Sequence, residues 1–392
     1  MRRRLDSAPA WLAVSTALAA CGTGPPPGQA TRDSAGIILA ESTQPVHRDR
    51  PLFRIDPTPT IDLGGEGDPR REFARIAVQR LSDGRLVIVD GPSRELRWFH
   101  PDGRWIRTVG RQGGGPGEFR QLELVRGFVD TVAIFDLALR RLSLFDTAAR
   151  YLGGTPLPSD GALSPVPIAG LSGGRLLLRG YPEALPGVEG FTRFPVTLLV
   201  ASITGDAVRQ VGTFPDHETV VTQGPDGYAT SRVLFARMAA FAAAGTSILV
   251  ATNDSFGFDV YAPDGRLERR VRRPFEPRIV READVEAFIE WAAARVPEGQ
   301  TVRRARLRDY YRMAPRPERM PPLDRLLVAA DGLVWVRRYH PEFATDQPGH
   351  WSVFDSRGRW LTEVETPAGL DVESIDGRSV LGTWADELGL VH

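Results

Sequence analysis

The chain has 392 residues, 42% hydrophobic and 25% charged, so it can bury a sizeable core and does not have the composition of a disordered protein. Acidic and basic residues balance at 49 each, and all 49 basic residues are Arg because the sequence contains no Lys. This balance gives no positive field for nucleic acid, so we expect no nucleic-acid partner. The missing Lys excludes a Schiff-base lysine, a pyridoxal phosphate anchor and a P-loop lysine.

The first residues have the form of an export signal. Three Arg residues at positions 2 to 4 precede the apolar run WLAVSTALAA, which ends at Cys21, the only cysteine. A run of about ten residues is too short to cross a bilayer core of ~30 Å. LAAC, at 18–21, is similar to the lipobox of bacterial lipoproteins, whose cysteine is acylated. We predict a signal peptide over 1–20 and lipidation at Cys21; an incidental buried thiol and a twin-arginine signal are the weaker interpretations.

The residues after Cys21 predict a cellular location and a flexible tether. The residue at position 22 is Gly rather than Asp, and the resemblance to lipoproteins then implies the outer membrane. Residues 21–35 are rich in Pro and Gly without apolar periodicity, which is typical of a tether. We therefore expect a cell-envelope lipoprotein held to the membrane by its lipid anchor, with a folded body over 36–392.

Six β-rich runs of strand length recur along this body, each led in by Gly or a polar turn residue. They are GRLVIVD at 84, DTVAIFD at 130, GRLLLRG at 174, TSILVAT at 246, GLVWVRR at 332 and GRSVLGT at 377. Most precede a hairpin such as LRWFHPDGRWIRTV, in which Pro-Asp-Gly supplies a tight turn between two apolar strands. With the apolar segment before each run, these pieces make a four-stranded unit about every 45 residues, which is typical of propeller blades.

Two spacings between the runs are longer than the others. The first holds a predicted loop at 181–193 before the strands PVTLLVAS and AVRQVGTF. The second holds apolar residues at helical spacing: Val285, Phe288, Ile289, Ala292 and Val296. We predict an all-β, six-bladed β-propeller with a helical insert at 279–320, between blades 4 and 5. The last repeat is too short for four strands, so the stretch at 36 or the one at 52 is expected to complete it and close the ring.

Residues 83–119 resemble an NHL-type blade, and the chain resembles the bacterial six-bladed β-propeller lipoproteins. GRQGGGPGEF, at 110–119, is the most specific piece, and the similarity is weak over the third and sixth repeats. The resemblance implies a propeller fold and a surface location. NHL relatives include protein-binding and RNA-binding propellers, and related six-bladed rings include calcium-dependent lactonases.

Residues that follow the second strand of a blade are expected to line the rim of the central channel, where propellers usually bind. They are Asp90, Asp136, Asn253, Asp254, Arg338, His340 and Trp384. The carboxylates among them could ligate Ca²⁺, which prefers oxygen ligands. Alternatively, an Asp at a strand end caps its own turn through hydrogen bonds from backbone N–H groups. No catalytic residue and no metal ligand is assigned.

Other motifs carry weaker signals. GLSGG, at 170–174, has nucleophile-elbow spacing but leads into a strand, so Ser172 is expected in a hairpin turn. GGGPGEF could gather backbone amides around an anion, yet it lacks the Lys and the helix of a phosphate loop, so we expect a loop between repeats. No His pair has the spacing of a zinc helix. The Arg-dense VRRARLRDYYR is expected to be a solvated face, with anionic lipid or an acidic partner as the alternative.

Two functions stay open at this point. In the first, the propeller binds a protein or small-molecule ligand, whose identity is unknown, without turnover and without a cofactor. In the second, it is a calcium-dependent lactonase or esterase at the channel mouth. Hydrolysis needs a carboxylate, an amide and a base that converge, and the sequence offers scattered carboxylates only. The sequence therefore favours binding.

Overall fold

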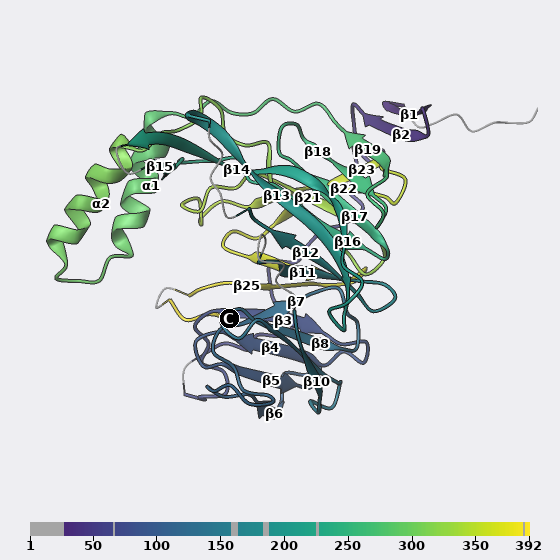
Figure 1. The fold of residues 1–392 in the computed structure, drawn as a ribbon, viewed down its shortest axis with the longest axis vertical. Coiled ribbons are helices and arrows are strands. Elements are labelled where there is room, and N and C mark those ends of the chain that lie inside the picture. The colour runs from purple at the N-terminus through teal and green to yellow at the C-terminus, as the bar shows by residue number, and fades with distance from the viewer. Residues whose placement is uncertain (1–26, 66, 158–163, 183–187, 225–226, 387–388) are drawn as a thin grey trace, which may run out of the picture.

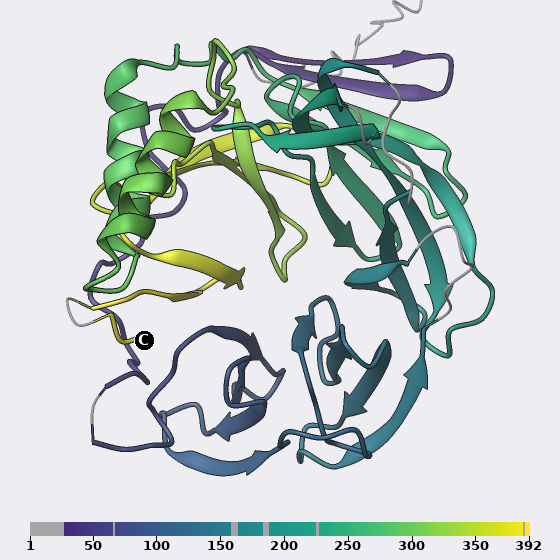
Figure 2. The same cartoon turned by 60° about the vertical axis from the view of Figure 1, so that its left-hand side comes forward.

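The computed structural model describes residues 27–65, 67–157, 164–182, 188–224, 227–386 and 389–392. The predicted signal peptide and Cys21 lie outside the described residues. Within that part of the chain the protein is mostly β with two helices, and its strands form six sheets. The sheets are arranged around a common centre, as a β-propeller-type fold requires (Figure 1, Figure 2).

Three sheets come from residues 76–232, and consecutive strands within each pair antiparallel. The first sheet contains β3 (Ile76–Arg80), β4 (Leu86–Asp90), β5 (Glu95–Phe99) and β6 (Trp105–Val109). The second contains β7 (Leu122–Val125), β8 (Val132–Asp136), β9 (Arg141–Phe145) and β10 (Tyr151–Pro156). The third contains β11 (Val166–Leu171), β12 (Arg175–Gly180), β13 (Gly190–Ser202), β14 (Arg209–Gly224) and β15 (Gly227–Arg232).

The remaining sheets come from the second half of the chain, joined by the N-terminal hairpin of β1 (Gln29–Ser34) and β2 (Ile37–Ser42). The fourth sheet contains β16 (Ala240–Ala244), β17 (Ser247–Ala251), β18 (Gly257–Tyr261) and β19 (Leu267–Arg272), and β2 and β1 extend it. The fifth contains β20 (Leu323–Val328), β21 (Val334–Arg338), β22 (Gly349–Phe354) and β23 (Trp360–Thr366). The sixth contains β24 (Asp371–Ile375) and β25 (Val380–Thr383).

The first strands of the six sheets are in contact in a closed order. β3 contacts β7, and the contacts continue through β11, β16, β20 and β24 back to β3. Each of the six repeated runs of the sequence forms the second strand of its sheet. The hairpins that follow have the expected turns: Gly103 has φ +83°, a left-handed conformation that suits Gly, and the Asp102 carboxylate accepts the Arg104 N–H at 3.1 Å.

The hydrophobic core is divided among the interfaces between neighbouring sheets. Between the first two sheets, for example, the buried side chains of Val87 and Trp98 pack against those of Val132 and Phe145. Clusters of the same kind fill the other interfaces, including the one between the sixth sheet and the first. Because each large apolar side chain contributes roughly 1.5–3 kcal/mol when fully buried, every sheet depends on both of its neighbours for stability.

The expected route of ring closure is wrong for the segment at 36. β2 pairs in parallel with β19, with Ala40 opposite Val271, and so joins the fourth sheet rather than the sixth. The side chain of Ala40 is buried in a cluster that also contains Val271 and Trp360, so the apolar face of IILA is covered there. The strand β1 also begins inside 21–35, the segment that we expected to be a tether.

After β2 the chain crosses onto the fifth sheet. The N–H groups of Val46 and His47 donate to the carbonyls of Trp360 and Leu361 at 2.9 and 2.8 Å. We call residues 45–51 the strap, because this segment joins the fourth sheet to the fifth. Farther on, the ring of Phe53 packs against that of Trp335 with centroids 5.5 Å apart, so the segment at 52 covers the ring by side-chain packing and forms no strand.

Two helices, α1 (Glu282–Ala294) and α2 (Thr301–Met313), lie between β19 and β20. Val285, Phe288 and Ile289 are buried on α1 against a cluster that includes Phe235. Part of the predicted loop at 181–193 is instead strand, since β13 begins at Gly190 and pairs with an unusually long β14. Of the helices that the structure describes, none has the length and apolar character needed to span a membrane.

Candidate binding pocket

Two of the predicted rim carboxylates are buried at the ends of their strands and form hydrogen bonds within the protein. Asp136 ends β8 with its side chain fully buried, and its carboxylate accepts the N–H groups of Arg120 at 2.6 Å and Leu139 at 2.9 Å. Asp90 ends β4, is also buried, and accepts the Ser93 hydroxyl at 2.9 Å. The contacts with Leu139 and Ser93, three residues on, are those of the turn-capping interpretation, whereas the contact with Arg120 joins Asp136 to the segment before β7.

Asn253 and Asp254, after β17, form hydrogen bonds and ion pairs with other parts of the chain. The buried side chain of Asn253 bonds to the backbone of Leu323 on the fifth sheet. The half-exposed Asp254 pairs with Arg193 at 3.1 Å and Arg237 at 2.9 Å. Within the described ranges there is no group of three or more His, Cys, Asp or Glu side chains placed to hold a metal ion. Asp90, Asp136 and Asp254 are therefore not brought together as one group of three carboxylates.

Trp384 belongs to a contact between the two ends of the described chain. Its ring stacks on that of His392 with centroids 4.3 Å apart. The Nδ1 atom of His392 lies 2.9 Å from Asp62 Oδ1, and Nε2 lies 3.4 Å from Asp386 Oδ2. Burial alone would lower the pKa of His392, but the hydrogen bonds with the two carboxylates outweigh it and raise that pKa.

The glycine-rich GGGPGEF segment gathers backbone amides around a side chain of its own. The Glu118 carboxylate accepts the N–H groups of Gly115 at 2.8 Å and Gly114 at 3.1 Å. These hydrogen bonds, together with Arg111, hold the pKa of Glu118 below its ordinary value. The amides are thus already occupied by an anion from the same loop. Ser172 lies, as expected, in the turn between β11 and β12.

The other predicted residues, Arg338 and His340, line two separate pockets beyond the end of β21. The pocket at His340 has a volume of about 280 Å³ and contains Arg337 and Asp371. Its one guanidinium already has carboxylate partners, because Arg337 bonds to Asp324 at 2.7 Å and contacts Asp371 at 3.3 Å. Burial raises the pKa of Asp324 despite the attraction of Arg337. This pocket therefore offers an anion no guanidinium that is without a carboxylate partner.

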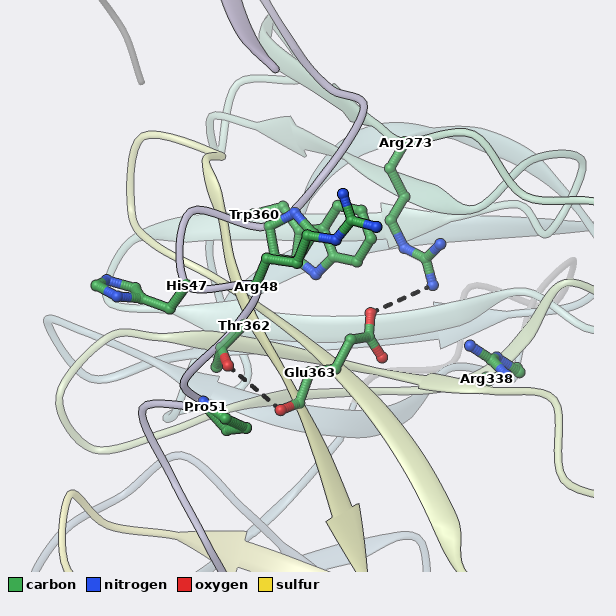
Figure 3. A pocket seen from close by; sticks show the side chains of 9 residues that line it. His47, Arg48, Pro51, Arg273, Arg338, Trp360, Thr362 and Glu363 are labelled. Atoms are coloured by element: carbon green, nitrogen blue, oxygen red, sulfur yellow. Dashed lines mark hydrogen bonds and ion pairs between the residues drawn. The ribbon is translucent and has the colours of Figure 1, made fainter. Parts of the chain in front are cut away.

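The pocket at Arg338 lies beneath the strap, and we call it the strap pocket (Figure 3). It has a volume of about 250 Å³ and opens to solvent. Its walls come from the strap, from the residue after β19, and from the ends of β21 and β23. The lining residues are Pro45, His47, Arg48, Pro51, Arg273, Arg338, Trp360, Thr362 and Glu363.

Arg273 is the buried cation of the strap pocket, with its side chain 6% exposed. Its guanidinium lies 3.8 Å from the ring centroid of Phe256 and 4.4 Å from that of Trp360. It donates to the Ser352 hydroxyl at 3.0 Å and lies 3.6 Å from the Glu363 carboxylate. Burial lowers the pKa of Arg273 to about 10, although Glu363 opposes the change. The group still carries its charge at neutral pH.

Positive charge exceeds negative charge around this pocket. The lining contains Arg48, Arg273 and Arg338, against one carboxylate from Glu363. Arg48 and Arg338 are exposed and, within the described part of the chain, neither forms an ion pair with a carboxylate. Their charges are therefore available to an anion. Apart from Arg338, these residues carry no sequence signal, because they come from different repeats and share no motif.

Comparison with known proteins gives distant likenesses. No protein-family profile matches this chain, and no curated protein sequence matches it. Among solved structures, the chain is similar to a Bacteroides fragilis protein named as exported, with 12% identity, 88% of each chain covered and a TM-score of 0.43. It is also similar to a DUF4221 protein from Bacteroides vulgatus, with 6% identity, 81% of this chain and 89% of that chain covered, and a TM-score of 0.47.

A third similar structure is regucalcin, a calcium-binding protein from Agrobacterium tumefaciens. It shares 12% identity, the match covers 82% of this chain and 90% of that chain, and the TM-score is 0.37. Likenesses this distant carry no argument about the site, the ligand or the reaction of this chain.

Proposed function

We propose that the protein is a lipid-anchored propeller of the cell envelope that binds a ligand without turning it over. The six sheets would be the blades of one ring, with α1 and α2 as an insert between the fourth and the fifth. The closed order of contacts among the first strands supports this arrangement. The export signal and the lipobox-like LAAC support acylation at Cys21 and a place outside the cytoplasm, with the outer membrane implied by the lipoprotein resemblance.

One observation carries the choice of binding over hydrolysis. The strand-end carboxylate of Asp136, which a calcium-dependent lactonase could use for its metal, already accepts the backbone N–H groups of Arg120 and Gln121, before β7, and of Leu139 in the turn after β8. The Oδ2 atom of Asp90 accepts the Ser93 hydroxyl and lies 3.4 Å from the Arg97 guanidinium, whereas its Oδ1 atom is buried without a hydrogen-bond partner. Asp254 is already paired with two Arg side chains. Using Asp136 as a metal ligand would take the acceptor from these part-buried N–H groups, at a cost of up to about 1–3 kcal/mol each.

Two measurements on the chelator-treated, purified protein test this proposal. Calorimetric titration with Ca²⁺ is expected to give no binding heat. Ca²⁺ at about 5 mM, which is on the order of 10³ times the Kd of a micromolar site, is expected to leave the melting temperature unchanged. A pH-indicator assay with γ- and δ-lactones is expected to show no hydrolysis above the buffer rate. A calcium heat together with calcium-dependent lactone opening would overturn the proposal in favour of the hydrolase.

A further inference from the structure

We propose that the strap pocket is a binding site for a small organic anion, a carboxylate carried on an apolar, ring-bearing body. This inference rests on the proposed function, ligand binding without turnover, and adds the place and the chemical class of ligand. It is independent of the channel rim, because the pocket lies between the fourth and fifth sheets and under the strap (Figure 3).

The first argument is charge. Arg48 and Arg338 stand at the pocket without carboxylate partners in the described residues, and the buried Arg273 lies behind them. The guanidinium group presents a planar set of N–H donors that matches a carboxylate in geometry and in charge. The lining thus has two free cations and one cation that is shared with Glu363.

The second argument is the apolar surface next to those cations. Pro45 and Pro51 line the same pocket together with Trp360, which is only 8% exposed and has one face of its ring covered by Arg273. Pocket walls of aromatic and Pro side chains with a few placed polar groups are typical of small-molecule sites. A free phosphate ion would leave this surface exposed to water, whereas a carboxylate on a ring would cover it.

The third argument is the arrangement of Arg273 and Glu363. The carboxylate of Glu363 lies 3.6 Å from the guanidinium, which is longer than a hydrogen bond, while its Oε1 atom accepts the Ser352 hydroxyl at 2.7 Å. The Nε–H of Arg273 is buried without a hydrogen-bond partner. Glu363 therefore neutralises the buried cation only in part, and it competes with any anion that enters the pocket.

This competition gives variants with opposite effects. Arg338→Gln removes a free cation from an exposed side chain, so it should weaken anion binding without unfolding the protein. Glu363→Gln keeps an acceptor for the Ser352 hydroxyl and removes the competing charge, so it should strengthen anion binding. Arg303→Gln, on α2, removes one positive charge, as Arg338→Gln does, but at an exposed position outside the pocket, and it serves as the control.

The experiment uses benzoate, benzyl alcohol and inorganic phosphate as probes. Saturation-transfer NMR and titration calorimetry are performed on the full mature chain and on the three variants. We expect benzoate to bind at least ~10-fold more tightly than either of the other probes, about 1.4 kcal/mol. Arg338→Gln should weaken benzoate at least ~5-fold, Glu363→Gln should tighten it by a similar factor, and Arg303→Gln should leave it unchanged.

Each other outcome overturns the inference in a distinguishable way. Equal affinity for phosphate and benzoate would show that the apolar wall takes no part in recognition. Benzoate binding that all three variants leave unchanged would place the ligand elsewhere. The absence of benzoate binding would remove this site and leave the proposed function standing, whereas lactone hydrolysis in the assay above would remove the proposed function itself.

Discussion

Asn253 and Leu323 are hydrogen-bonded in both directions across two neighbouring sheets. The Asn253 Nδ2 group donates to the Leu323 carbonyl at 2.6 Å, and the Leu323 N–H donates to Asn253 Oδ1 at 3.1 Å. The side-chain amide thus takes the place of a backbone peptide and joins the end of β17 to the start of β20. Asn253 also has φ +67°, a conformation that Asn tolerates better than most residues.

Asn253→Ala should therefore be strongly destabilising. It leaves a buried N–H and a buried carbonyl of Leu323 without partners and places Ala in a left-handed conformation, so the free energy of unfolding should fall by roughly 2–5 kcal/mol. Denaturant unfolding followed by tryptophan fluorescence measures the change. The neighbouring Asp254→Asn is the control: it weakens half-exposed ion pairs only, and should cost less than about 1 kcal/mol. Equal effects of the two variants would contradict the cross-sheet role.

Asp136 supplies a second prediction at the predicted rim. Asp136→Ala removes a buried acceptor from the part-buried N–H groups of Arg120 and Leu139, so the free energy of unfolding should fall by about 2–4 kcal/mol. Asp136→Asn keeps one acceptor oxygen and should cost less. If the side chain served a metal instead, both variants would abolish a calcium-dependent rise in melting temperature, and the wild type would show such a rise.

Two glycines in turns of the fifth sheet allow the cost of backbone strain to be measured apart from the cost of packing against β2. Gly358 has φ +84°, and a Cβ atom there would lie 2.9 Å from the Cβ of Ala40 and 2.6 Å from Cγ2 of Val271. Gly332 has φ +82° with nothing within 4 Å of such an atom. Gly332→Ala should cost roughly 1–2 kcal/mol, since it introduces strain alone. Gly358→Ala should cost about 1–3 kcal/mol more, because overpacking adds to the strain.

Thermal unfolding of the two Ala variants checks this difference. A variant that lacks residues 27–44 provides the complementary measurement, because it removes the clash with Ala40 while the contact with Val271 stays. The extra cost of Gly358→Ala over Gly332→Ala should shrink in that truncated chain. The same difference in both backgrounds would show that β2 does not pack on this turn in solution.

The contact of His392 with Asp62 and Asp386 predicts a pH dependence of stability. The pKa of His392 is raised in the folded state, so folding favours its protonated form. The stabilisation is fully present below the unfolded pKa, near 6.5, and is lost as the pH rises through the higher folded value. The difference in unfolding free energy between wild type and His392→Gln should thus be larger at pH 6 than at pH 8.5. The charge interaction that causes this change contributes about 0.5–1 kcal/mol.

His392→Gln loses the stacking on Trp384 at every pH. Only the change of the stability difference with pH therefore reports on the charge of His392. Asp62→Asn should reduce that change without altering the stack. A difference between wild type and His392→Gln that stays constant from pH 6 to pH 8.5 would contradict a protonated His392.

Membrane attachment predicts a simple fractionation result. The wild type expressed in a bacterium with a lipoprotein pathway should sediment with membranes and dissolve in detergent, whereas Cys21→Ser should remain in the soluble extract. Metabolic labelling with a fatty acid should mark the wild type only. Equal solubility of the two proteins would refute acylation at Cys21.

The sequence predicted those features that repeat along it. All six β-rich runs form second strands, and turns such as Asp102-Gly103 have the backbone conformation that their residues favour. The pairing of β2 could not be predicted, because IILA has the pattern of a half-buried strand and would suit the edge of any sheet. Only the three-dimensional fit of Ala40 beside Val271 and Gly358 selects the fourth one.

The candidate site was predicted far less well, for a physical reason. Arg338 was expected at a rim, but Arg273, Trp360 and Glu363 come together only when two neighbouring sheets and the strap are assembled. A pocket between repeats leaves no spacing rule in the sequence, because its residues are separated by whole strands and a helical pair. Asp90 and Asp136 did share a position in the sequence pattern, at the end of a second strand. This position reflects the hydrogen bonds that an Asp side chain forms in the turn that follows.

The pairing of β2 with β19 also decides which strand of the fourth sheet is left without a neighbour. Without the hairpin, β19 would present unpaired backbone groups beside buried Val271, a template on which another copy could add a strand and start aggregation. With it, the outermost strand is β1, whose sequence QATRDS is polar and exposed along most of its length and includes Arg32 and Asp33. The segment next to the proposed anchor would thereby keep neighbouring molecules, crowded on one membrane, from joining edge to edge.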